Sequence, residues 1–200
     1  MDCNKVGTLL HGLRKEKGMT QKQIADQLNI SDKTISKWER GLGCPDVSLL
    51  GALSELLEVN IEQILAGELK SNTIEIGNLK RIKFYVCPSC GNVISSSGEA
   101  EISCCGRKLS PLLAQESEEQ HAVTVEDAEG EYYITFDHEM SKAHYISFVA
   151  YVASDKLLLA RLYPEQMAEV RLPKINGARL NQKYGARLYY YCTKHGLWVL

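Results

Sequence analysis

The feature that most restricts the fold is a change in hydrophobic spacing about one third of the way along the 200-residue chain. Over residues 5–66, apolar residues recur every three or four positions, which is the spacing of amphipathic helices. Short polar or glycine-containing breaks divide this stretch, and Thr20, Ser31 and Asp46 are suitable N-cap residues. We therefore expect five short helices packed as a compact bundle.

From Phe84 onward the apolar pattern is typical of β-strands instead, with runs such as EYYITF, YISFVAYV and ARLYYYC. Dipeptides that form turns, among them Glu129-Gly130 and Asn176-Gly177, separate some of these runs. The polar stretch between the two patterns, GELKSNTIEIGNLKRIK, has little periodicity and is typical of a linker. The expected order is α then β: a helical domain over 1–67, a linker over 68–83, a small cysteine-centred unit over 84–113, and a β-sandwich over 114–200.

The composition restricts the cellular setting. No run of about 18 apolar residues occurs, so we expect no membrane span, and the start MDCNKVGTLLHGLRKEKG is amphipathic rather than a signal peptide. We therefore expect a cytoplasmic protein. In that reducing compartment, seven cysteines are better explained as metal ligands or catalytic groups than as disulfides. The net charge of -2 does not exclude DNA binding, because local charge decides that property.

The stretch TQKQIADQLNISDKTISKWERG predicts two helices joined by a tight turn. Ile24 and Ala25 face inward on the first helix, Ile35 and Trp38 anchor the second, and Asn29 tolerates the left-handed conformation that the turn requires. The positions left outside the second helix are polar or basic, and Arg14 to Arg40 contains seven Lys or Arg against four Asp or Glu. A helix with such a surface suits the major groove of double-stranded DNA.

This segment resembles the Cro and lambda-repressor-like helix-turn-helix family, also called the xenobiotic-response-element family, over residues 5–66. The run TISKWERG, followed by Pro45 and a leucine-rich fourth helix, carries the resemblance, whereas Asn29 stands where the family usually has glycine. Such domains usually bind two half-sites as dimers, so the resemblance implies a homodimer. The resemblance also implies which residues contact DNA. Gln21 would contact a backbone phosphate, and Thr34 and Arg40 would lie nearer the phosphates. The residues that would lie toward the bases are Asp32, Lys33, Ser36 and Lys37. The alternative is a helical bundle used only for protein contacts.

Four cysteines form two close pairs that are typical of a metal site. Cys87-Pro-Ser-Cys90 places two thiolates on one knuckle, and the adjacent Cys104 and Cys105 supply two more, which suits tetrahedral zinc or iron. CPSCGNVISSSGEAEISCCGRKL resembles desulforedoxin and the N-terminal iron domain of desulfoferrodoxin, which implies one iron ion. The spacing does not distinguish iron from structural zinc, and unliganded thiols are a third alternative. Cys3 and Cys44 lie outside the pattern and are interpreted as ordinary residues.

Four of the five histidines lie in the β segment with one further cysteine, whereas His11 lies in the first helix without an evident partner. Four neutral imidazoles and one thiolate would fill a square pyramid around iron and leave one position open. An axial thiolate would push electron density toward a molecule bound opposite it. These five candidate ligands are His121, His138, His144, Cys192 and His195.

The motifs EEQHAV, HEMSKAHYISF and CTKHGLW resemble the superoxide reductase domain of neelaredoxin and desulfoferrodoxin. The resemblance covers residues 84–200 and implies an immunoglobulin-like β-sandwich with non-haem iron that reduces superoxide to hydrogen peroxide. It implies that Glu119 caps the oxidised iron. Gln120 stands where the family has lysine, which should weaken the attraction of superoxide. Glu139 replaces a proline of the family, and Lys142 is a candidate for the missing positive charge.

Three functions follow from these patterns. The first is a DNA-binding transcriptional regulator whose iron module senses or reduces superoxide. The second is a superoxide reductase, with an unknown electron donor, that carries an accessory DNA-binding domain. The third is a DNA-binding protein whose sandwich holds zinc or no metal and serves only structure or dimerisation. Retention of all five candidate ligands favours the first two, and Gln120 favours the first over the second.

Overall fold

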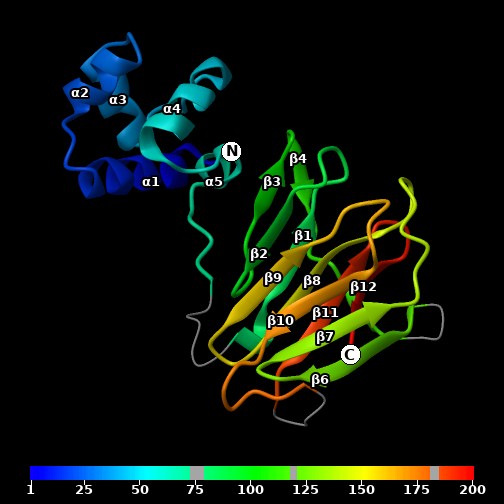
Figure 1. Cartoon of the computed structure of the whole chain (residues 1–200). Helices are drawn as coiled ribbons and strands as arrows, with labels where there is room; N and C mark the ends of the chain where they lie inside the picture. The colour runs from blue at the N-terminus through cyan, green and yellow to red at the C-terminus, as the bar shows by residue number, and fades with distance from the viewer. Residues whose placement is uncertain (73–78, 118–120, 181–184) are drawn as a thin grey trace. The chain divides into compact units, whose positions relative to one another are not determined.

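The computed structural model describes residues 1–72, 79–117, 121–180 and 185–200. Contacts within the chain divide it into two compact units, Met1–Asn72 and Thr73–Leu200 (Figure 1). In the described ranges no helix is both long enough and apolar enough to span a bilayer.

The first unit consists of five α-helices and one 3₁₀ turn, which confirms the predicted bundle. Its core is formed by the periodic apolar residues of the sequence, including Leu10, Ile35, Leu53 and the indole of Trp38, all of which are buried. The elements are α1 (Cys3–Glu16), α2 (Gln21–Gln27), α3 (Asp32–Glu39), η1 (Val47–Leu49), α4 (Leu50–Leu57) and α5 (Ile61–Ala66).

The predicted turn and caps between α2 and α3 are confirmed. Thr20 caps α2 through a capping box with Gln23, and Ser31 caps α3 by accepting the Thr34 N–H. Asp46 likewise caps η1. Asn29 has φ 54°, the left-handed conformation expected of this turn. The sequence therefore correctly predicts the residue at which α3 begins.

Two cysteine and histidine predictions in this unit were wrong. Cys3 and Cys44 are joined by a disulfide, because the bundle brings their Cα atoms to 4.9 Å although they are 41 residues apart. His11 is not without a partner: its Nδ1 lies 2.9 Å from Oε2 of Glu39, at the end of α3. Both errors come from contacts between residues that are distant in sequence.

The described residues of the second unit form twelve β-strands, most of which are labelled in Figure 1. A three-stranded sheet of order β10-β7-β6 and a five-stranded sheet of order β5-β12-β11-β8-β9 form the sandwich, and β1-β2 and β3-β4 form two antiparallel pairs. The strands are β1 (Lys83–Val86), β2 (Val93–Ser96), β3 (Ile102–Cys104), β4 (Arg107–Leu109), β5 (Ala114–Glu116), β6 (Val123–Ala128), β7 (Glu131–Phe136), β8 (Ile146–Val152), β9 (Leu157–Arg161), β10 (Glu169–Pro173), β11 (Arg187–Cys192) and β12 (Gly196–Val199), preceded by the 3₁₀ turn η2 (Leu79–Arg81).

Strand β8 is buried along its whole length because both of its faces are covered. Val149 and Tyr151 point into the core between the two sheets, whereas Phe148 and Ala150 lie on the opposite face. There Phe84 of β1 packs on Phe148, with ring centroids 5.4 Å apart. The cysteine-bearing hairpins are thus anchored on the outer face of the five-stranded sheet.

Candidate metal centres and nucleic-acid interface

Ligand atoms of four predicted residues come together at one end of the sandwich. One atom each from His121, His144, Cys192 and His195 lies within 4.8 Å of the others. These residues lie at the ends of different strands: His121 precedes β6, His144 precedes β8, and Cys192 ends β11. The β8–β11 register shifts between Tyr191 and Cys192, so that Cys192 pairs with Ile146. Such an irregularity changes the direction of a side chain at the end of a strand.

The fifth predicted residue, His138, lies beside this group. Its Nε2 is 3.5 Å from the Cys192 sulfur, and its ring centroid is 4.3 Å from that of His144. His195 directs Nδ1 to the same point, 3.7 Å from the sulfur and 3.0 Å from Nε2 of His121. Four imidazoles and one thiol therefore converge.

The His138 ring is in a chemical state suited to metal binding. Burial, together with the neighbouring His144 and His121, lowers the pKa of His138 to about 4. A ring with such a pKa is neutral at pH 7, and neutral imidazole is the form that binds metals. Because several imidazoles cannot be charged so close together, the cluster favours a cation over protons.

One carboxylate orients His144. Oε1 of Glu139 lies 2.8 Å from its Nδ1 and accepts a second hydrogen bond, also 2.8 Å, from the Ser141 hydroxyl. The hydrogen bond from Ser141 lowers the pKa of Glu139 most, and the bond with His144 lowers it further. Nε2 of His144 is buried and has no hydrogen-bond partner among the described residues. A histidine held by a carboxylate on one nitrogen, with the other left unpaired, is the usual arrangement of a metal ligand.

Other neighbours fix His121 and His195. The indole of Trp198 stacks on the His121 ring, with centroids 4.4 Å apart and an interplanar angle of 18°. The Tyr190 hydroxyl donates to the His121 carbonyl at 2.8 Å, and the Gln115 amide donates to that of His195 at 3.1 Å. The sequence did not predict these roles, because each partner lies far from its histidine along the chain.

Two residues predicted to act in catalysis, Glu119 and Gln120, lie outside the described residues. Lys142, the candidate replacement for a missing positive charge, is exposed and lies 3.7 Å from the Glu165 carboxylate. Its charge is therefore paired with an opposite charge on the surface.

The four other predicted thiols form a second cluster. One sulfur from each of Cys87, Cys90, Cys104 and Cys105 lies within 4.8 Å of the rest, and those of Cys90 and Cys104 are 3.6 Å apart. Adjacent cysteines reach the same point because Cys105 has φ 51°, a left-handed conformation. Four sulfurs from two hairpins match the donor set of a tetrahedral thiolate site.

The thiols of this cluster differ in acidity. Backbone N–H groups of Cys90 and Ser89 hold the pKa of Cys87 at about 6. Interactions with the thiols of Cys90, Cys87 and Cys104 raise that of Cys105 to about 12. Since four thiolates this close repel one another, a bound cation would be needed to deprotonate all of them at pH 7.

In the helical unit all predicted DNA contacts except Gln21 lie on α3 or directly after its last residue. Asp32, Lys33, Lys37 and Arg40 are exposed, and Thr34 and Ser36 are half-buried beside them. Gln21, at the start of α2, donates through its amide to Oε2 of Glu39 at 2.8 Å. The amide predicted to contact phosphate is thus positioned by the end of α3.

Glu39 connects three helices. Its side chain is only 4% exposed and accepts hydrogen bonds from Arg14 of α1 and Gln21 of α2, with His11 also in contact. Burial raises the pKa of Glu39, but the hydrogen bonds from Arg14, Gln21 and His11 outweigh it and hold the pKa at about 2. The position of α3 relative to α1 and α2 therefore depends on one buried carboxylate.

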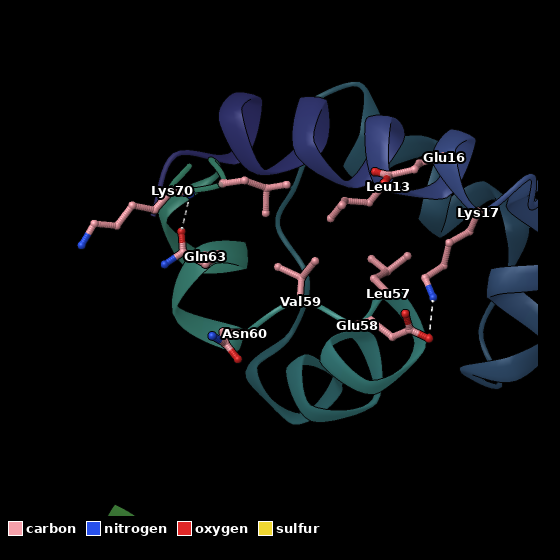
Figure 2. Close-up of a pocket in the computed structure, with 10 residues that line it drawn as sticks. Leu13, Glu16, Lys17, Leu57, Glu58, Val59, Asn60, Gln63 and Lys70 are labelled. Atoms are coloured by element: carbon pink, nitrogen blue, oxygen red, sulfur yellow. Dashed lines mark hydrogen bonds and ion pairs between the residues drawn. The ribbon is translucent and has the colours of Figure 1, made fainter. Parts of the chain in front are cut away.

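An open groove of about 570 Å³ lies on another part of the helical unit, between α1 and the turn from α4 to α5 (Figure 2). Leu13, Leu57 and Val59 line it with apolar surface, and an ion pair of 3.0 Å between Lys17 and Glu58 borders it. None of the predicted DNA contacts lines it.

Comparisons with known proteins divide the chain in the same way. A family model described as Helix-turn-helix matches residues 10–64. The HTH-type transcriptional activator BcrR of Enterococcus faecalis is 40% identical over 80 residues, which is 38% of this chain and 39% of that protein. This chain thus covers about two fifths of the length of the activator.

The remainder of the chain is similar to different proteins. The desulfoferrodoxin of Desulfarculus baarsii is 28% identical over 127 residues, covering 60% of this chain and 95% of that protein. The crystal structure of the superoxide reductase from Treponema pallidum matches 60% of this chain and 96% of its own, with a TM-score of 0.50 and 19% identity. At that identity the likeness shows the fold alone.

Proposed function

We propose that this chain, which joins a helix-turn-helix domain to a desulfoferrodoxin-like module, is a DNA-binding transcriptional regulator that senses or reduces superoxide at a non-haem iron. The observation that carries the proposal is the convergence of four imidazoles and one thiol on the chain that also carries the exposed basic face of α3. A regulator needs both parts, because a signal must be detected and DNA must be bound.

The donor set fits iron. His121, His138 and His144 would hold the iron through Nε2, His195 through Nδ1, and Cys192 through its sulfur. Iron held there would supply one electron to superoxide. Glu139 and Trp198 would keep the His144 and His121 rings oriented through that change, while Cys192 would supply a negatively charged sulfur ligand.

Gln120 and Lys142 support sensing over rapid turnover. Gln120, which precedes His121 in the sequence, carries no positive charge, and the charge of Lys142 is offset by Glu165, so neither would steer an anion strongly. The complete set of five donors nevertheless favours a second candidate function, a superoxide reductase that draws electrons from an unidentified donor and carries an accessory DNA-binding domain. Superoxide turnover by the purified chain distinguishes the two.

For the helical unit we propose a homodimer on double-stranded DNA. Gln21, Thr34 and Arg40 would contact phosphates, and the base edges would be met by Asp32, Lys33, Ser36 and Lys37. Support for a dimer comes from exposed apolar side chains: Ile61 and Leu65 of α5 are 39% and 38% exposed, and Leu69, which lines the groove, is 52% exposed.

For the four-cysteine cluster we propose a single iron or zinc ion. The clustering of four sulfurs suits either metal, and only the bound ion itself distinguishes them.

The experiment that tests the metal proposal is metal analysis with a visible spectrum of protein purified without oxygen and then oxidised. We expect two irons per chain, or one iron and one zinc, with a thiolate-to-iron absorption band that disappears in Cys192→Ser. Cys105→Ser is the matched control, because it removes a thiol of the other cluster and should leave this band unchanged. Zinc alone, or no metal and no band, would exclude the iron centre.

A further inference from the structure

A third cysteine pair lies in the helical unit, outside both clusters. The disulfide joins Cys3, the first residue of α1, to Cys44, in the segment between α3 and η1. Both cysteines are partly exposed, so small oxidants and reductants can reach them. The bond closes a loop that contains α1, α2 and all of α3.

The segment that Cys44 anchors also completes the last turn of α3. The N–H of Gly41 donates to the carbonyl of Trp38, and the N–H of Leu42 donates to that of Lys37. Gly41 lies against α1, since a Cβ there would be 2.0 Å from Oδ1 of Asn4. The start of α1 and the end of α3 are therefore in direct contact, and the disulfide lies beside that contact.

We propose that Cys3 and Cys44 form a thiol–disulfide switch that controls DNA binding from within the DNA-binding unit. The oxidant is hydrogen peroxide, the product of superoxide reduction, so this oxidant rests on the proposed function. One thiol loses its proton, and the thiolate attacks a peroxide oxygen to give a sulfenic acid and hydroxide, which takes up that proton to become water; the second thiol then displaces a second water to form the disulfide. Two thiols and one peroxide thus give one disulfide and two waters. A dithiol reverses the step by exchange.

The position of Cys3 favours this chemistry. Cys3 lies in the first turn of the 14-residue α1, and thiols at helix N-termini attack peroxides readily because the helix dipole stabilises the thiolate. In the bonded chain the Cα atoms of Cys3 and Cys44 are 4.9 Å apart, within the ordinary range for a disulfide, so the folded bundle accommodates the bond.

The direction of control follows from what the bond restrains. Lys37 and Arg40, two of the proposed DNA contacts, belong to the turn that ends at the anchored segment. With the bond intact this turn is held against α1, whereas reduction lets residues 41–44 move and frays the end of α3. A preorganised contact surface binds more tightly, so the oxidised chain is the stronger DNA binder.

The test uses the full chain in oxidised form, in dithiothreitol-reduced form, and as the Cys3→Ser, Cys44→Ser double variant. Hydrogen exchange of the Leu42 amide is measured in each, together with affinity for a duplex selected in vitro with the oxidised chain. We expect exchange on the order of tenfold faster, and affinity on the order of fivefold weaker, in the reduced chain and in the double variant. Hydrogen peroxide should restore the reduced chain but not the variant.

Equal Leu42 exchange in the oxidised and reduced chains overturns the switch, as does DNA binding that is equal or tighter after reduction. A variant that responds to peroxide like the natural chain overturns it too. If no duplex is bound by any form, the proposed regulatory function fails instead, and the exchange measurement alone then decides whether the disulfide controls the end of α3.

Discussion

Replacing Glu39 by glutamine tests the buried network that positions the proposed DNA-binding helix. Glu39→Gln keeps the shape of the side chain but removes its charge. The guanidinium of Arg14, only 6% exposed, would then be buried without a counter-charge. Removing one partner of a buried ion pair is more damaging than removing both, because the remaining charge keeps its desolvation penalty.

The magnitude follows from the pKa of Glu39. That pKa is about 2 in the folded chain and about 4.3 in an unfolded chain, and the gap corresponds to about 3 kcal/mol at neutral pH. A unit of this size has a free energy of unfolding of about 4 to 10 kcal/mol, so a large part of its stability would be lost.

The sign of the pH dependence is fixed by the lowered pKa. The carboxylate stabilises the fold fully above its unfolded pKa of about 4.3, and this contribution disappears as the pH falls toward about 2. The free energy of unfolding of the natural chain should therefore fall over that pH interval, whereas Glu39→Gln should lack the part of the fall that comes from protonating Glu39.

Urea unfolding of the full, oxidised chain, followed by helical circular dichroism, measures the effect. We expect the midpoint of the helical transition to fall by about 3 M, for a slope of about 1 kcal/mol per molar urea. Glu58→Gln is the matched control: it breaks the exposed pair with Lys17 and should cost less than about 1 kcal/mol. A loss below 1 kcal/mol for Glu39→Gln, or an unchanged acid dependence, would refute the reasoning.

Three further predictions concern the sandwich. Glu139→Ala should weaken iron binding on the order of tenfold, because His144 loses the carboxylate that orients it. Glu165→Ala is the control, and iron affinity is measured by competition with a chelator. Equal affinities of the two variants would show that Glu139 does not position His144. Trp198→Leu should broaden or shift the ligand-field spectrum of the loaded site, because the ring stacked on His121 is lost; an unchanged spectrum would show that the stack does not hold that ligand. Lys142→Ala should leave any superoxide turnover within about twofold, because Glu165 already offsets the charge, and a much slower rate in stopped flow would show that Lys142 steers the anion.

The periodic and motif-like parts of this molecule could be predicted from sequence. The helix spacing, the caps and the left-handed Asn29 are local properties, and the structure confirms them. Strands β7, β8 and β11 were also visible, because they are rich in aromatic and β-branched residues. Strands β4, β5, β10 and β12 were missed: β4 and β5 have three residues each, and β10 contains charged residues and ends at Pro173.

What could not be predicted depends on contacts across the fold. The disulfide of Cys3 with Cys44 and the His11–Glu39 contact bring together residues 41 and 28 positions apart, and no local signal marks either pair. The stacking of Trp198 on His121 likewise depends on strand order. The donors themselves were visible because histidine and cysteine are few and were grouped, whereas their neighbours are common residue types without a pattern.

In the proposed regulator, the state of the iron module changes DNA binding. The direct measurement is the affinity of the full chain for a selected duplex, once with the iron reduced by dithionite and once with it oxidised by superoxide. Both measurements use the Cys3→Ser, Cys44→Ser double variant, which lacks the disulfide. We expect affinities that differ severalfold between the two states, with no difference once Cys192→Ser is added. Equal affinities in both iron states, with the thiolate-to-iron band present, would contradict the claim and favour a reductase with an accessory DNA-binding domain.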